Sequence, residues 1–164
     1  MTEERKHTIS LLVGNESGVL SRVAGLFSGR GFNIESLCVA ETLDPEFSRI
    51  TLVTRGNERI IEQINKQLNK LINVVKVTDL TETEFVEREM ALVKVRAKEE
   101  HRAEILRIVD IFRCKVVDVS PAYYTVEVTG SDEKIAAILG LLKQIGIKEI
   151  ARTGAIALAR EAKK

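Results

Sequence analysis

The sequence predicts an α+β protein built from two tandem sandwiches, each with the order βαββαβ. Segments in which apolar and polar residues alternate, as in strands, are separated by segments whose apolar residues recur at helical spacing. The same order of segments occurs twice within the 164 residues, on either side of the polar stretch 79–87. A sheet with two helices on one face is the ferredoxin-like arrangement, which we expect in both halves.

The first half contains every segment of one βαββαβ unit. Gly29 and Gly31 are candidates for ending the first helix, Asp44-Pro45 suits a hairpin turn, and Asn57 can cap the second helix. The expected elements are a strand at 8–13, a helix at 19–27, strands at 33–43 and 47–54, a helix at 57–71 and a short strand at 74–77.

The second half repeats the pattern. Ser120-Pro121 must lie in a turn, because a central strand does not tolerate proline. Tyr123 and Tyr124 are adjacent, so one ring is expected in the core and the other at an interface. The expected elements are a strand at 89–98, a helix at 104–112, strands at 115–119 and 124–128, a helix at 135–145 and extended structure at 148–159.

These elements predict a first domain at residues 1–79, a linker at 80–87 and a second domain at 88–164. A sheet that is covered by helices on one face only leaves its other face and its edges open. Small domains manage such surfaces by association, and a twofold homodimer is the simplest assembly.

Composition excludes several classes of function. The formal net charge is +1 with both signs interspersed, which argues against a nucleic-acid-binding role. The longest apolar runs, such as 135–142, fall far short of the roughly 20 residues that span a membrane. Cys38 and Cys114 are far apart and unaccompanied, so no disulfide framework or zinc site is expected. The sequence therefore predicts a cytoplasmic protein without a metal site.

Residues that could perform catalysis are few and scattered. His7 and His101 have no nucleophile at a useful spacing, and exposed structural histidines are expected. Arg152 and Arg160 could hold a phosphate, but nearby Ala and Gly offer no cradle, so solvated charges are expected. We expect no catalytic residue and no enzyme activity in this chain.

The loop Gly14–Gly18, between the first strand and the first helix, is the most informative segment. Free amides at the start of a helix can bind a carboxylate, helped by the helix dipole. A plain turn with Asn15 and Ser17 as local caps explains the same pattern. The loop also lacks the arginine that an acylphosphatase-like enzyme would need, which argues against a phosphate-handling enzyme.

The sequence, including this loop, resembles one family over nearly its whole length: the regulatory small subunit of acetolactate synthase, or acetohydroxyacid synthase. The resemblance begins with residues 15–23, 25–28 and 30–37. It continues through residues 43–45, 48–51, 67–71 and 86–89, and then 111–113, 118–121 and 124–126.

The resemblance implies an N-terminal ACT domain that binds a free amino acid at a dimer interface, and a C-terminal ferredoxin-like domain. It also implies that the chain activates a separate catalytic large subunit and confers feedback inhibition by valine in branched-chain amino-acid biosynthesis, with leucine or isoleucine as further effectors. Thiamine diphosphate, magnesium and FAD would belong to the partner, and no cofactor is expected in this chain. The effector contacts that it implies are Asn15, Gly18, Val19 and Leu20, with Asn33 and Ile34 from the neighbouring chain.

A second interpretation is a freestanding ACT-type sensor that acts on another enzyme or regulates transcription. The sequence contains no basic helix-turn-helix segment before or after the repeats, which disfavours a transcription regulator.

Overall fold

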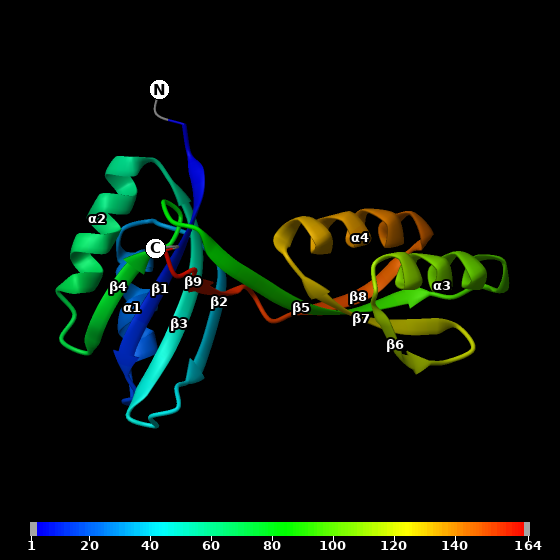
Figure 1. Cartoon of the computed structure of the whole chain (residues 1–164), viewed down its shortest axis with the longest axis horizontal. Coiled ribbons are helices and arrows are strands. Elements are labelled where there is room, and N and C mark those ends of the chain that lie inside the picture. The colour runs from blue at the N-terminus through cyan, green and yellow to red at the C-terminus, as the bar shows by residue number, and fades with distance from the viewer. Residues whose placement is uncertain (1–2, 163–164) are drawn as a thin grey trace. The chain divides into compact units, whose positions relative to one another are not determined.

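The computed structural model describes residues 3–162. The chain divides into two compact units, and the C-terminal segment returns to the first of them. The first unit runs to Val86 and resumes at Ala155, and the second spans Glu87–Gly154. Both are drawn in Figure 1. None of the helices within residues 3–162 is long and apolar enough to cross a membrane.

The first unit has the expected order βαββαβ. Its four strands form an antiparallel sheet in the order β2-β3-β1-β4, so β2 and β4 are the edges. The elements are β1 (Arg5–Gly14), α1 (Val19–Gly29), β2 (Ile34–Glu41), β3 (Phe47–Gly56), α2 (Glu58–Asn69) and β4 (Val74–Asp79).

The core of the first unit follows from strand alternation. Ile9, Leu11 and Val13 occupy every second position of β1 and are buried in one cluster with α1 residues such as Val23 and Phe27. This is the expected consequence of one sheet face packing on two helices. The helical stripe of α2 completes the cluster, with Ile61, Ile64 and Leu68 buried.

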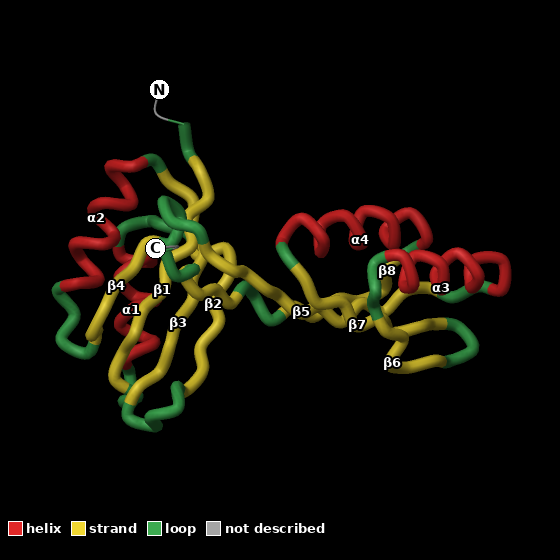
Figure 2. The backbone as a smooth tube through the Cα atoms, in the orientation of Figure 1, coloured by secondary structure: helices red, strands yellow, loops and turns green. Residues whose placement is uncertain are grey.

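The second unit repeats the order and the packing, with strand order β6-β7-β5-β8. Figure 2 shows α3 and α4 on the same side of these strands. Tyr124 packs against the core while Lys148 lies 4.4 Å from the ring centre of Tyr123, so the two rings face opposite sides as expected. The elements are β5 (Phe85–Arg96), the 3-10 turn η1 (Glu99–His101), α3 (Arg102–Ile111), β6 (Lys115–Val119), β7 (Tyr123–Gly130), α4 (Asp132–Ile145) and β8 (Ile147–Arg152).

The C-terminal segment departs from the expected single stretch at 148–159. Strand β8 ends at Arg152, the chain turns through Gly154 with φ +80°, and β9 (Ile156–Ala159) follows. Ala155 and Ala157 are buried, β9 contacts β1, and the amide of Arg160 donates to the carbonyl of Glu84 at 2.8 Å. Residues from Ala155 onward therefore group with the first unit, whereas the expected bounds put 88–164 in the second domain. Small alanine side chains permit this close approach.

The expected linker 80–87 is also partly ordered structure. Leu80 is buried, its amide donates to the carbonyl of Thr8 at 2.9 Å, and β5 already begins at Phe85. Only the short turn between Leu80 and Phe85 is a connection without secondary structure. The polar composition of residues 80–87 did not indicate this ordered structure. Hydrogen bonds to residues far away in the sequence fix the backbone of the segment.

Helices α1 and α3 end in the same motif with different residues at its left-handed position. After α1, Phe32 N–H donates to Phe27 C=O and Gly31 N–H to Ser28 C=O, with Gly31 at φ +68°. This is a Schellman motif, in which glycine carries no steric penalty. After α3, Arg113 takes the same position at φ +53°.

Arg113→Gly should therefore stabilise the protein by up to about 1 kcal/mol. The left-handed conformation costs a residue with a Cβ roughly 1–2 kcal/mol, of which the extra flexibility of glycine in the unfolded chain cancels about half. Gly31→Ala is the reciprocal control, because a Cβ there meets no atom within 4 Å and should lower stability through conformation alone. Calorimetric melting of the three proteins tests this, and equal midpoints would contradict it.

Candidate functional site

The loop between β1 and α1 is held by the two connections beside it. Its first residues are tied by backbone hydrogen bonds, from Gly14 N–H to the carbonyl of Asn73 and from Asn15 N–H to that of Glu46, both at 2.8 Å. Asn73 belongs to the α2–β4 loop and Glu46 to the β2–β3 hairpin. The loop therefore lies between two neighbours that fix its backbone.

The Asn15 side chain strengthens this attachment. Its Nδ2 donates to Glu41 Oε1 at 3.0 Å and to the carbonyl of Pro45 at 2.9 Å. Both amide protons are thus engaged by the hairpin, so a ligand could use only the Oδ1 oxygen, which is an acceptor. Glu16 continues the network on the other side, where it accepts from Asn73 Nδ2 at 2.7 Å.

Helix α1 begins without the side-chain cap that α2 and α4 have. Its N-cap is Gly18, at φ +86°, and no side chain caps it. By contrast, Asn57 caps α2 and Ser131 caps α4. Asn15 and Ser17 are therefore not caps, and the interpretation of the loop as a plain capped turn is wrong.

The uncapped start leaves backbone donors available. Val19 N–H makes only a long contact of 3.4 Å with the Glu16 carbonyl, and the first helical bond joins Arg22 N–H to the Gly18 carbonyl. Among residues 3–162, no acceptor takes the amides of Leu20 and Ser21. Such amides, with the positive end of the helix dipole behind them, suit a carboxylate.

The side chains at the start of α1 divide into inner and outer positions. Val19 is 4% exposed and belongs to the core, so only its backbone could meet a ligand. Leu20 is 43% exposed and offers apolar surface. A Cβ on Gly18 would meet no atom of the chain within 4 Å, so the space in front of the helix is open.

Asn33 and Ile34 lie at the opposite end of the same sheet. Ile34 pairs with Thr54, whose hydroxyl donates to the Asn33 carbonyl at 2.6 Å, and Thr54 in turn pairs with His7. Seven strand positions separate His7 from Gly14, which corresponds to about 23 Å. One chain therefore brings together Asn15, Gly18, Val19 and Leu20, and keeps Asn33 and Ile34 away from them.

The histidines differ from expectation. His7 is buried rather than exposed, at 2%, and its Nδ1 lies 3.0 Å from Asp79 Oδ2. His101 is half-buried. Alternation along β1 puts His7 on the core side with Ile9, a consequence of the strand beginning at Arg5, earlier than the expected start at residue 8. Within residues 3–162, neither histidine forms a hydrogen bond with a serine, threonine or cysteine, and no cluster of metal-ligating residues occurs.

Arg152 was expected to be a solvated charge, but it forms an ion pair. Its Nε and Nη2 donate to the two carboxylate oxygens of Glu89, at 2.6 and 3.0 Å, and Glu89 is buried. The Glu89 carboxylate raises the pKa of Arg152, so the guanidinium stays charged. This bidentate pair joins β5 to β8 and is structural. The sequence did not indicate this pair, because Glu89 and Arg152 lie 63 positions apart and belong to no common local pattern.

The network around Asn15 generates a pH-dependent prediction. Asn15→Asp replaces two donors with a carboxylate beside Glu41 and the Pro45 carbonyl, which should lower stability by about 1 kcal/mol or more at pH 7. Repulsion raises the pKa of the new carboxyl in the folded state, so its penalty is full above that pKa and shrinks as the pH falls toward about 4.

Asn15→Ala separates the two causes, because it removes the donors without adding charge. Its loss of stability should not vary with the ionisation of residue 15. Denaturant unfolding of both variants and the parent from pH 4 to pH 8 measures the difference. An Asn15→Asp penalty that is the same at both ends of this range would contradict the described geometry.

Comparison with known proteins places the chain within one family. The family described as the small subunit of acetolactate synthase matches residues 88–161, and the AHAS small subunit-like ACT domain matches residues 9–76. A probable acetolactate synthase small subunit of Archaeoglobus fulgidus is 52% identical over 97% of this chain and 99% of its own length. The acetolactate synthase small subunit of Aquifex aeolicus is 54% identical over 96% of this chain and 82% of its own. The crystal structure of the Thermotoga maritima small subunit superposes with a TM-score of 0.87, at 47% identity, over 97% of this chain and 99% of that one.

Proposed function

The chain belongs to the family of acetolactate synthase small subunits, and we propose that it activates the catalytic large subunit and makes it sensitive to feedback inhibition by valine. Leucine and isoleucine would also act, but more weakly. One extra methylene in an apolar pocket changes the binding free energy by only about 1–3 kcal/mol, so these larger amino acids would not be excluded. Thiamine diphosphate, magnesium and FAD would act in the large subunit. The chain itself would be a sensor in the cytoplasm and not a catalyst.

The observation that carries this proposal is the uncapped start of α1. A free amino acid needs donors for its carboxylate, acceptors for its ammonium group and an apolar surface for its side chain. The amides of Leu20 and Ser21 can serve the carboxylate, and Leu20 can contact an aliphatic side chain. Asn15 Oδ1, on the same loop, is an acceptor. The missing part is a wall opposite the helix.

A second copy of the chain can supply that wall through β2. This strand is an edge of the sheet, so its outer backbone groups can pair with another strand. If two β2 strands pair antiparallel about a twofold axis near their middle, the Ile34 end of one strand lies beside the Glu41 end of the other. Glu41 is hydrogen-bonded to Asn15, so Asn33 and Ile34 of the second copy would arrive beside the β1–α1 loop, residues 14–18, which we call the effector loop.

Regulation would follow from where the ligand binds. An amino acid held between two chains stabilises one relative arrangement of those chains. If the catalytic subunit prefers a different arrangement, effector and catalytic subunit weaken each other's binding by the same factor. The proposal thus needs no catalytic group in this chain.

Gly18→Asp should abolish valine inhibition while activation of the large subunit remains. The new side chain would project into the open space before α1, and its charge would repel the carboxylate of valine. Gly18→Asn is the matched control, because asparagine tolerates the left-handed conformation comparably and has the same size. Calorimetric titration with valine should show no binding to Gly18→Asp and weakened or no binding to Gly18→Asn.

Acetolactate formation by the purified large subunit, measured with each variant and increasing valine, gives the functional result. Activation by the parent chain that valine reverses supports the proposal. A Gly18→Asp variant that is still inhibited by valine contradicts the assignment of the site, and a parent chain that neither binds nor activates the large subunit contradicts the function.

Pairing of β2 strands predicts a specific cross-link through Cys38. This residue lies near the middle of β2, so two copies would approach each other across the twofold axis. The chain has one other cysteine, Cys114, and burial raises the pKa of its thiol despite the opposing influence of Lys134. A short thiol cross-linker should join two Cys114→Ser chains into a dimer.

The Cys38→Ser chain should give no such product under the same conditions. Denaturing electrophoresis across a range of protein concentrations measures the cross-linked fraction. Equal cross-linking of both single-cysteine chains, or none in the Cys114→Ser chain at concentrations where light scattering finds dimers, would contradict pairing through β2.

A further inference from the structure

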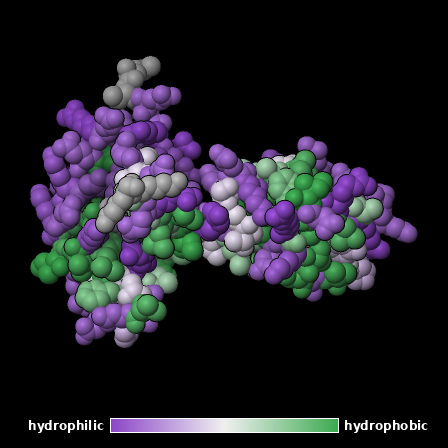
Figure 3. Space-filling model, in the orientation of Figure 1, coloured by the Kyte–Doolittle hydropathy of each residue, from purple (hydrophilic) through white to green (hydrophobic). Residues whose placement is uncertain are grey.

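Exposed large apolar residues gather at one end of the first sheet. Within residues 5–79, which hold its βαββαβ elements, they lie in the half that carries the β1–α1 loop, and they are Leu20, Val39, Leu43, Ile72 and Val75. Figure 3 shows hydrophobic surface over the lower part of this unit and hydrophilic surface at the opposite end. Monomeric proteins seldom gather exposed apolar side chains in this way without a binding role.

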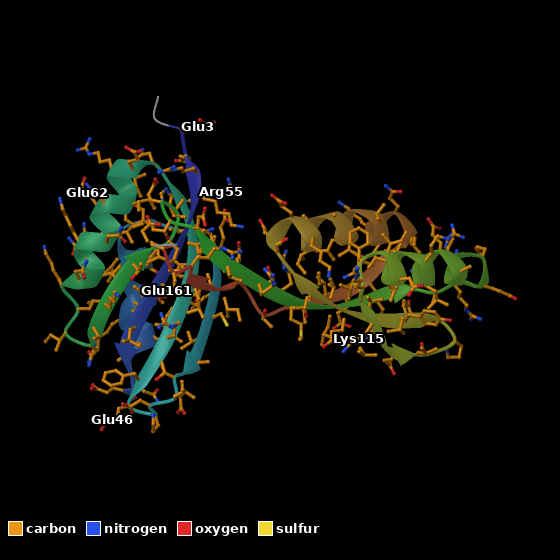
Figure 4. The ribbon with its side chains drawn as sticks, in the orientation of Figure 1. Glu3, Glu46, Arg55, Glu62, Lys115 and Glu161 are labelled. Carbon is orange, nitrogen blue, oxygen red and sulfur yellow. The ribbon has the colours of Figure 1, made fainter. Side chains whose placement is uncertain are left out.

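Leu43 and Ile72 are extreme members of this group. Their exposed fractions are 107% and 98%, so neither side chain is buried by any part of the chain. Leu43 is at the tip of the β2–β3 hairpin and Ile72 is in the α2–β4 loop. In Figure 4, Glu46 of the hairpin and Arg55 mark the two ends of β3. Leu43 lies in the same hairpin as Glu46.

The two tips stand on either side of the effector loop. In the order β2-β3-β1-β4, the hairpin joins the first two strands and the α2–β4 loop leads into the last, with the β1–α1 loop between them. Strands lie about 4.8 Å apart, so the two tips are separated by roughly 10–15 Å. This separation fits within one standard protein interface, which covers about 800 Å² on each partner.

Hydrogen bonds also connect each tip to the effector loop. Asn15 binds Glu41 and Pro45, which flank Leu43 in the hairpin. Asn73, next to Ile72, receives a hydrogen bond from Gly14 and donates to Glu16. A ligand that shifts residues 14–18 would therefore shift both exposed apolar residues.

We propose that Leu43 and Ile72 are the anchors by which this chain docks on the catalytic subunit of acetolactate synthase. The inference rests on the proposed function, and it adds the surface through which effector binding is read out. The occupant is chosen on charge and position. Residues 41–46 contain three carboxylates, of Glu41, Asp44 and Glu46, and no basic residue, so the pocket of the partner that takes Leu43 should be rimmed by Lys or Arg.

A second copy of this chain is disfavoured as the occupant of both anchors. Self-pairing would use β2, whereas Ile72 precedes β4 at the other edge of the sheet. A single twofold contact through β2 therefore leaves Ile72 uncovered. The large subunit has to bind a surface that remains free in the dimer and that responds to the effector, and the loop end meets both conditions.

The full exposure of the two anchors allows an effect on docking to be separated from an effect on folding. Because neither side chain is buried in the free chain, Leu43→Ser and Ile72→Ser should leave folding stability essentially unchanged. Loss of an interface anchor typically weakens association by tenfold or more. Ile111→Ser is the matched control, because Ile111 is 69% exposed on α3 of the second unit.

The experiment measures the affinity of each chain for the purified catalytic subunit, by biolayer interferometry at two salt concentrations. Valine affinity and dimer mass of each free chain are measured alongside by calorimetry and light scattering. We expect at least tenfold weaker binding for Leu43→Ser and Ile72→Ser, unchanged binding for Ile111→Ser, and unchanged valine affinity and dimer mass throughout. Association of the parent should slow as salt rises.

Three results overturn the inference while leaving the proposed function intact. They are parent-like affinity of both anchor variants, an equal loss for Ile111→Ser, and loss of the dimer in either anchor variant, which would assign the tips to self-association. A parent chain with no affinity for the catalytic subunit overturns the proposed function itself. The two failures are therefore distinguishable.

Discussion

The hydrogen bonds that fix the β1–α1 loop between its two neighbours are the constraint on which the rest of the first unit's chemistry depends. Gly14 and Asn15 are tied by backbone and side chain to Asn73, Glu46, Glu41 and Pro45. With the loop held from outside, Gly18 can start α1 in the left-handed conformation without a capping side chain. The helix therefore keeps open donors at its first turn, which an ordinary cap would have consumed.

The same arrangement keeps the two groups of residues that the proposed site would use apart within one chain. Its sheet separates the β1–α1 loop from Asn33 and Ile34 by most of a strand's length, and β2 remains an unpaired edge. Incomplete binding surfaces at a free edge are a simple way to make ligand binding depend on association. In the proposed site, ligand binding and assembly would therefore be coupled.

Local signals in the sequence predicted most of the fold. Alternation, helical spacing, Asn57 and the Asp44-Pro45 turn identified the order of both units, because each signal acts over a few residues. The Glu89–Arg152 pair and the return of Ala155 to the first unit were not predictable in the same way. Each depends on residues more than 60 positions apart, and tertiary packing decides them. At the site, the sequence indicated the loop and its amides, but it gave no sign that both protons of Asn15 are used by the hairpin.

In the proposed site, a free amino acid binds between the start of α1 in one chain and the start of β2 in another. Nuclear magnetic resonance of the labelled protein during titration with valine tests it most directly. The resonances of the Leu20 and Ser21 amides and of the Asn33 side-chain amide should shift together, with one dissociation constant. In a dimer mixed from labelled and unlabelled chains, contacts between valine and Ile34 should come from the opposite chain. Shifts confined to one end of the sheet, or valine contacts to both ends within a single chain, would contradict it.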